Sequence, residues 1–122
     1  MECSCYALRG AVTVENDTPG EITAAVKEMF EKLLELNKLG EDELAFIHFS
    51  QTDDLRSLNA ASALRKGGHG SSVPLFCTQE AGSEGAMEKC IRVLVLVAHA
   101  EVCEKKMVYL GRAGALRPDL RG

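Results

Sequence analysis

Hydrophobic and polar residues follow two patterns of spacing along this chain, one typical of helices and one typical of strands. Apolar residues recur at helical spacing over residues 22–34 and predict a long helix with one apolar face. Just before them, Thr18 suits a helix cap, Pro19 the first helical position and Glu21 the partner in a capping box. A second, alanine-rich helix is predicted over residues 55–66.

Short apolar segments between turn residues predict five strands. They cover residues 5–15, 44–50, 73–80, 91–100 and 108–110. Gly10 interrupts the first of them and indicates either a bulge or the close approach of another backbone. We expect a turn with one helical turn over residues 81–90, and no regular element over residues 112–122, where Pro118 stands.

The order of these elements predicts an α/β (α+β) fold built on a single mixed β-sheet with two main helices. A length of 122 residues suits one domain over residues 1–122, with residues 117–122 as a short tail. Two helices cannot cover both faces of such a sheet. Apolar strand faces would then stay exposed in a monomer, which favours an oligomer.

One arginine begins the most apolar segment of the chain. Arg92 directly precedes the run Val93–Val97, which is typical of a strand buried on both faces. A guanidinium group cannot simply lose its water in such a place. Either Arg92 lies at a solvated end of the strand, or an anion meets it there.

Composition and charge narrow the function classes. The chain has 46% hydrophobic and 26% charged residues, as ordinary globular proteins do, and a net charge of −4. This charge argues against a general nucleic-acid binder, because no basic excess is available for phosphates. No apolar stretch approaches the roughly 20 residues of a membrane helix, and no secretion signal is recognisable. We therefore expect no membrane partner and a cytoplasmic location.

Five cysteines are present, an odd number that favours free thiols in a reducing compartment. Cys3 and Cys5 are two residues apart, a spacing that a metal clip could use. No second pair of cysteines or histidines follows at zinc-finger spacing, so we expect no metal site. His48, inside an apolar segment, is interpreted as a strand residue rather than as a ligand or base.

The usual motifs of nucleophilic, phosphate-binding, zinc and dinucleotide sites are missing. Several polar residues lie within or beside the apolar strand segments and in the tail. They are Arg9, Glu80, Arg92, Tyr109 and Arg117. Each arginine could simply pair with a surface carboxylate. If the five converge on one pocket, however, several guanidinium groups with one carboxylate and one phenol suit a small dicarboxylate that carries a hydroxyl group.

Five segments together resemble the AroH class of chorismate mutases, the small trimeric type. They are residues 8–22, 73–80, 89–93, 108–110 and 116–120. The resemblance implies a trimer that forms a pseudo-α/β-barrel, with each active site between two subunits. It also implies the conversion of chorismate to prephenate, the isomerase step toward phenylalanine and tyrosine, without any cofactor or metal.

The resemblance assigns roles residue by residue. Arg92 matches the arginine that faces the ether oxygen, where negative charge grows in the transition state. Glu80 matches the carboxylate that contacts the ring hydroxyl and lies near the developing cationic ring system. These two residues are the implied catalytic pair.

Five further residues match substrate-binding positions of the family. Arg9 matches an arginine that binds a substrate carboxylate, and Tyr109 a phenol that donates a hydrogen bond to a carboxylate. Cys77 matches a pocket cysteine near the ring hydroxyl, in a packing and weak hydrogen-bonding role. Arg65 and Arg117 match arginines at the pocket rim and on the tail, which help to attract the dianion.

The start of the second helix departs from the family pattern. Asn59 stands where the resemblance implies an aromatic lid, Ala60 where it implies a proline, and Ser62 also alters the mouth. Two alternatives therefore stay open beside the enzyme. One is a family member that binds a chorismate-like dicarboxylate as a regulator without efficient catalysis, and the other is an interaction module without a ligand.

Overall fold

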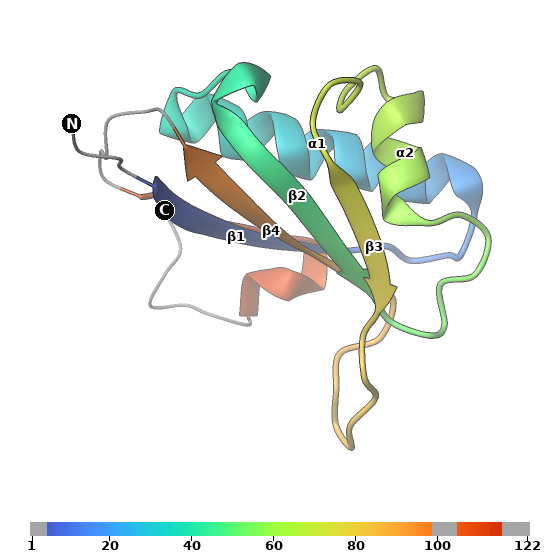
Figure 1. Cartoon of the computed structure of the whole chain (residues 1–122). Coiled ribbons are helices and arrows are strands. Elements are labelled where there is room, and N and C mark those ends of the chain that lie inside the picture. The colour runs from blue at the N-terminus through green and yellow to red at the C-terminus, as the bar shows by residue number, and fades with distance from the viewer. Residues whose placement is uncertain (1–4, 99–104, 116–122) are drawn as a thin grey trace.

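The computed structural model of the chain describes residues 5–98 and 105–115. Its elements are β1 (Cys5–Thr13), α1 (Pro19–Asn37), η1 (Glu41–Glu43), β2 (Leu44–Gln51), α2 (Ala60–Lys66), β3 (Leu75–Gln79), β4 (Cys90–Ala98), β5 (Val108–Leu110) and η2 (Gly111–Ala115). The strands form one mixed sheet in the order β3-β2-β4-β1-β5. Antiparallel pairing joins β4 to β2 and β1, whereas β3 and β5 pair in parallel with β2 and β1. In Figure 1, α1 and α2 lie above the sheet and η2 lies below it.

The predicted apolar face of α1 packs on the sheet and forms the core. Ile22, Val26, Met29 and Phe30 are fully buried among the core-facing strand residues. The hydroxyl oxygen of Thr18 accepts a hydrogen bond from the N–H of Glu21, as predicted. The Glu21 carboxylate bonds to the N–H of Asn16 rather than back to the cap, so the reciprocal half of the capping box is wrong.

The second helix is shorter than predicted. It begins at Ala60 instead of residue 55, because the Asn59 side chain accepts a hydrogen bond from the N–H of Ser62 and caps the helix there. The carbonyl groups of Leu55 and Leu58 bond to the side chain of Gln51 instead of to helical partners. Leu55 is nevertheless buried, so the loop contributes to the core.

β4 is buried on one face, which corrects the expectation of burial on both. Ile91, Val93, Val95 and Val97 are buried toward α1 and α2, whereas Arg92 and Leu94 alternate with them on the opposite face. We call this opposite side of the sheet the outer face; it also carries Phe46, His48 and Ser50 of β2, Phe76 and Thr78 of β3, and Arg9 of β1. The helices α1 and α2 cover the other side, and η2 packs only on the part of the outer face around Ala11, so Arg92 lies on a partly solvated surface.

Gly10 marks a close approach of backbones and not a bulge. The pairing of β1 with β4 runs without a shift from Cys5 to Thr13. A Cβ atom at residue 10 would lie 2.9 Å from the carbonyl oxygen of Val108 and 3.2 Å from Cγ1 of Val93. The missing side chain therefore gives β5 room beside β1.

Two smaller expectations are wrong. The turn expected over residues 81–90 is present, with the N–H of Ala86 bonded to the carbonyl oxygen of Ser83, but it contains no helical turn. Residues 111–115 form the 3₁₀-helix η2, although no regular element was expected from residue 112 onward. Within the described ranges, no helix has both the length and the apolar character that a membrane crossing requires.

Candidate active site

Two arginines share the outer face of the sheet. In the strand register, Arg92 of β4 lies opposite Ser50 and Ala11, and Arg9 of β1 lies opposite Leu94. Arg9 and Arg92 are therefore diagonal neighbours on adjacent strands, a relationship that places Cα atoms about 7–8 Å apart. Both line one cavity of about 300 Å³, together with Ser50. Two guanidinium groups at one cavity favour an anionic ligand.

Arg92 also contacts a carboxylate group. Nε of Arg92 lies 2.8 Å from Oε1 of Glu80, with 42% of the arginine side chain and 26% of the glutamate side chain exposed. The Nε atom itself is buried, and its N–H is not aligned for a hydrogen bond with any described residue. The pair is thus a charge contact in which Nε of Arg92 is occupied by the Glu80 carboxylate.

The end of β2 positions Glu80. The hydroxyl of Ser50 donates a hydrogen bond of 3.1 Å to Oε1 of Glu80, the same oxygen that faces Arg92. The main-chain N–H of Glu80 donates to the carbonyl oxygen of Gln51 at 2.8 Å. The sequence analysis did not identify Ser50. The strand topology could have indicated it, because β2 and β3 are parallel and their carboxyl ends lie side by side. Residues 50 and 80 therefore come together.

A second network anchors the start of β4. Both carboxylate oxygens of Asp54 accept from the main-chain N–H of Lys89, and Asp54 also accepts from the Thr52 hydroxyl. That hydroxyl oxygen accepts in turn from the N–H of Cys90. Burial raises the pKa of Asp54, but the hydrogen bonds from Thr52 and Lys89 outweigh it and hold that pKa below its ordinary value. Lys89, with a φ of 47°, is thereby fixed in the turn that leads to Arg92.

Comparison with known proteins decides the family. The family model described as chorismate mutase type I matches residues 5–120. The chain belongs to this family. It is 37% identical over 115 residues to chorismate mutase AroH of Bacillus subtilis (strain 168), a match that covers 93% of this chain and 90% of that protein. It is also 41% identical over 116 residues to chorismate mutase AroH of Thermus thermophilus, with 93% of each covered.

A solved structure shows the same fold. The chain matches a chorismate mutase from Clostridium thermocellum with a TM-score of 0.80 and 37% identity, over 87% of this chain and 96% of that one. The mixed five-stranded sheet with two helices is therefore the fold of a chorismate mutase type I protein. The family resemblance recognised in the five sequence segments is confirmed.

Not all the family-matched side chains reach the cavity of Arg9 and Arg92 within one chain. The Cys77 thiol packs against the core and donates to Oε1 of Gln51 at 3.2 Å, on the other face of β3. Tyr109 lies opposite Ala11 in the pairing of β1 with β5. It packs against a small buried cluster that consists of Ala11, Cys90 and Ala113. It lines a different hollow, of about 330 Å³, between β5 and the end of α1.

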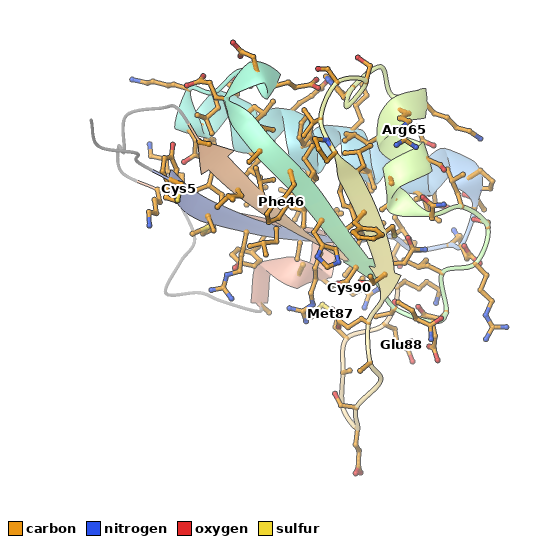
Figure 2. The ribbon with its side chains drawn as sticks, viewed as in Figure 1. Cys5, Phe46, Arg65, Met87, Glu88 and Cys90 are labelled. Carbon is orange, nitrogen blue, oxygen red and sulfur yellow. The ribbon has the colours of Figure 1, made fainter. Side chains whose placement is uncertain are left out.

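The remaining matched positions lie in the helix layer or outside the described residues. Arg65 is exposed on α2, as Figure 2 shows, and α2 lies across the sheet from the outer face. Arg117 is outside the described residues, as are Cys3 and Cys103. A single copy of this chorismate mutase type I chain thus brings together Arg9, Glu80 and Arg92, but leaves Arg65, Cys77 and Tyr109 apart from them.

Proposed function

We propose that this chain catalyses the conversion of chorismate to prephenate. In this unimolecular rearrangement the enol ether C–O bond breaks while a C–C bond forms, and no atom or electron leaves the molecule. The protein must therefore hold the substrate folded and stabilise charge as it separates. The ion pair of Arg92 and Glu80 beside a cavity that Arg9 also lines, in a chain of this family, carries the proposal.

Arg92 and Glu80 are the proposed catalytic residues. A guanidinium group next to the ether oxygen stabilises the negative charge that grows there, and it acts more strongly on the transition state than on the substrate. The exposure of Arg92 supports this role, since 42% of its side chain is exposed and the residue lines the cavity. The Glu80 carboxylate would accept from the ring hydroxyl and counter the positive charge of the ring.

Arg9, Arg65, Cys77, Tyr109 and Arg117 are proposed to bind the substrate. A bidentate fork from Arg9 suits one of the two carboxylates. Arg65 and Tyr109 lie apart from the Arg9 cavity in one chain, so a neighbouring copy would have to contribute to each site. The proposed active form is accordingly a homotrimer with interfacial sites.

Exposed apolar side chains on the outer face support the trimer. Phe76 is 73% exposed, Leu94 37% and Phe46 36%, and a cavity of about 290 Å³ separates the two phenylalanines. A contiguous apolar surface of this kind is typical of an interface. Sedimentation equilibrium should give three times the chain mass for the wild type and a lower mass for Phe76→Asp. A monomeric, fully active wild type would contradict the trimer.

We propose a cytoplasmic location because the described cysteines are free thiols. Cys5, Cys77 and Cys90 are free, as expected in a reducing compartment. Fractionation of cells that express the tagged chain would test this location.

The deciding experiment is an assay of the purified chain with chorismate, in which prephenate is converted by acid to phenylpyruvate and measured. Product formation well above the uncatalysed rate is expected. Tight chorismate binding without product would instead indicate the regulatory binder, and neither binding nor product would indicate an interaction module.

A further inference from the structure

A buried glutamine connects the end of β2 to the second helix. Gln51, the last residue of β2, is 8% exposed. Its Nε2 donates to the carbonyl oxygens of Leu55 at 3.0 Å and Leu58 at 3.2 Å. Its Oε1 accepts from the N–H of Ala60 at 2.8 Å and from the thiol of Cys77 at 3.2 Å. All four hydrogen bonds that a side-chain amide can make are thus used.

These bonds tie together three separate segments. Ala60 is the first residue of α2, Leu55 and Leu58 belong to the loop before that helix, and Cys77 lies in the middle of β3. The main-chain carbonyl of the same glutamine accepts from the N–H of Glu80. The main-chain bond survives any substitution at residue 51, whereas the four side-chain bonds do not. A substitution therefore releases α2 and its loop but leaves the Glu80 backbone tied to β2.

The backbone at the start of α2 could accept a proline. Proline is favoured at the first helical position, and it requires an extended residue before it. Asn59, with φ −84° and ψ 152°, is extended. Ala60 instead supplies the N–H that Oε1 of Gln51 accepts, so a side-chain hydrogen bond fixes the helix start where a proline ring would otherwise restrict it.

We propose that Gln51 is a positioning residue that sets the first turn of α2 against the substrate site, and that its effect is coupled to the residue at position 60. The proposal rests on the proposed function with its interfacial site, because α2, which carries Arg65 and follows Asn59, lies across the sheet from the Arg9 cavity of its own chain. Loss of the Gln51 amide would loosen the mouth and weaken substrate binding. The charge pair of Arg92 and Glu80 would stay in place, so turnover of bound substrate changes little.

A double-mutant cycle tests the coupling. Gln51→Ala should raise KM for chorismate by about tenfold or more while kcat stays within about threefold, the split expected when binding alone is weakened. Ala60→Pro should raise KM in the wild type but lower it in the Gln51→Ala background, with an interaction of about tenfold, or roughly 1.4 kcal/mol. Additive effects of the two substitutions, or an unchanged KM in Gln51→Ala, would overturn the proposal.

Gln79→Ala is the matched control. Gln79 lies opposite Gln51 in the register of β3, but it is exposed. Its removal should leave KM unchanged. An equal rise in KM for both glutamine variants would mean that any disturbance of the β2–β3 pair weakens substrate binding. This result would contradict a specific role of Gln51.

Hydrogen exchange separates this proposal from the proposed function. Peptides that cover residues 60–66 should exchange faster in Gln51→Ala than in the wild type, while peptides of β1 keep their protection. This result does not depend on chorismate turnover, so an inactive wild type would refute the function alone. If Gln51→Ala fails to fold, Gln51→Met keeps the volume and Ala60→Pro removes a single bond. Unchanged exchange over residues 60–66 in Gln51→Met would overturn the proposal.

Discussion

Arg92 and Glu80 face each other at 2.8 Å, and Nε of the arginine is buried without a hydrogen bond to any described residue. The arginine side chain is nevertheless 42% exposed and lines the cavity, so a substrate oxygen can meet the rest of its guanidinium group. Arg92→Ala should therefore lower kcat about 10²–10³-fold, which corresponds to about 3–4 kcal/mol of transition-state stabilisation. Steady-state kinetics with chorismate checks this. Arg56→Ala, a variant of an exposed arginine that bonds to the Asp53 carbonyl, serves as the control. Ordinary turnover by Arg92→Ala would disprove the assigned role.

Arg9 is expected to act mainly on binding. It is exposed at the cavity wall, and its proposed partner is a substrate carboxylate present before and during the reaction. Arg9→Ala should raise KM about 10–100-fold, the range for a lost charge-assisted hydrogen bond, with a smaller change in kcat. Arg9→Lys should recover only part of this loss, because an ammonium group lacks the bidentate fork. An unchanged KM for Arg9→Ala would contradict the prediction.

Ser50 should matter through Glu80. Ser50→Ala removes the hydroxyl that donates to Oε1 of Glu80 and frees the carboxylate to rotate away from Arg92. We expect kcat/KM to fall about 10–100-fold, the effect of one hydrogen bond to a charged group. Ser57→Ala removes a comparable hydroxyl, which donates to Asp17, and should leave kcat/KM unchanged. Equal activities of the two variants would exclude a role for Ser50.

Asp54 should make the stability of the fold depend on pH. Its pKa lies below the ordinary value of 3.8 in the folded state, so the folded chain favours the charged carboxylate. The stabilisation is present at neutral pH, where Asp54→Ala should cost about 1–3 kcal/mol, and it is lost as the pH falls below about 4. Urea unfolding of wild type and variant at pH 7, 5 and 3.5 measures the difference. A difference that is constant over this range would contradict the assignment.

Cys90 should resist alkylation in the folded protein. Burial raises the pKa of its thiol above the ordinary value of 9.0, although the Arg92 charge acts in the opposite direction. The residue is 1% exposed, whereas Cys5 is exposed. Mass spectrometry after brief treatment with iodoacetamide at pH 8 should find Cys5 modified and Cys90 intact. Modification of Cys90 at the rate of Cys5 would refute the burial.

Elements with local signals were predicted well from the sequence. The cap at Thr18 and the apolar stripe of α1 depend on neighbours within a few residues, and the strand segments carry their own β-branched composition. The start of α2 was wrong because it depends on Asn59 and on the side chain of Gln51, which lies nine positions before Ala60. A glutamine at the end of a strand does not reveal in the sequence which carbonyl groups it will bond.

Polar residues within apolar strands indicated candidate site residues, and the family resemblance then assigned their roles. Arg9, Glu80 and Arg92 could be named, and the structure brings them together on the outer face. The apolar run after Arg92 misled the burial prediction, since an uninterrupted run does not tell how many faces of the sheet carry helices. Ser50 was not predicted as a site residue, because its contact with Glu80 depends on the parallel pairing of β2 with β3, which no local pattern reveals.

The order of strands in the sheet has a consequence for synthesis of the protein. β2 and β3 are close in sequence and can pair while the chain emerges from the ribosome, but β1 pairs with β4 and β5, which are made last. Contacts between such distant segments form slowly, and an apolar strand that waits for its partners is prone to aggregation. Arg9 reaches Arg92 only after nearly the whole chain has been translated. A nascent chain that stalls before Cys90 thus lacks both partner strands of β1 and cannot bring Arg9 beside Arg92.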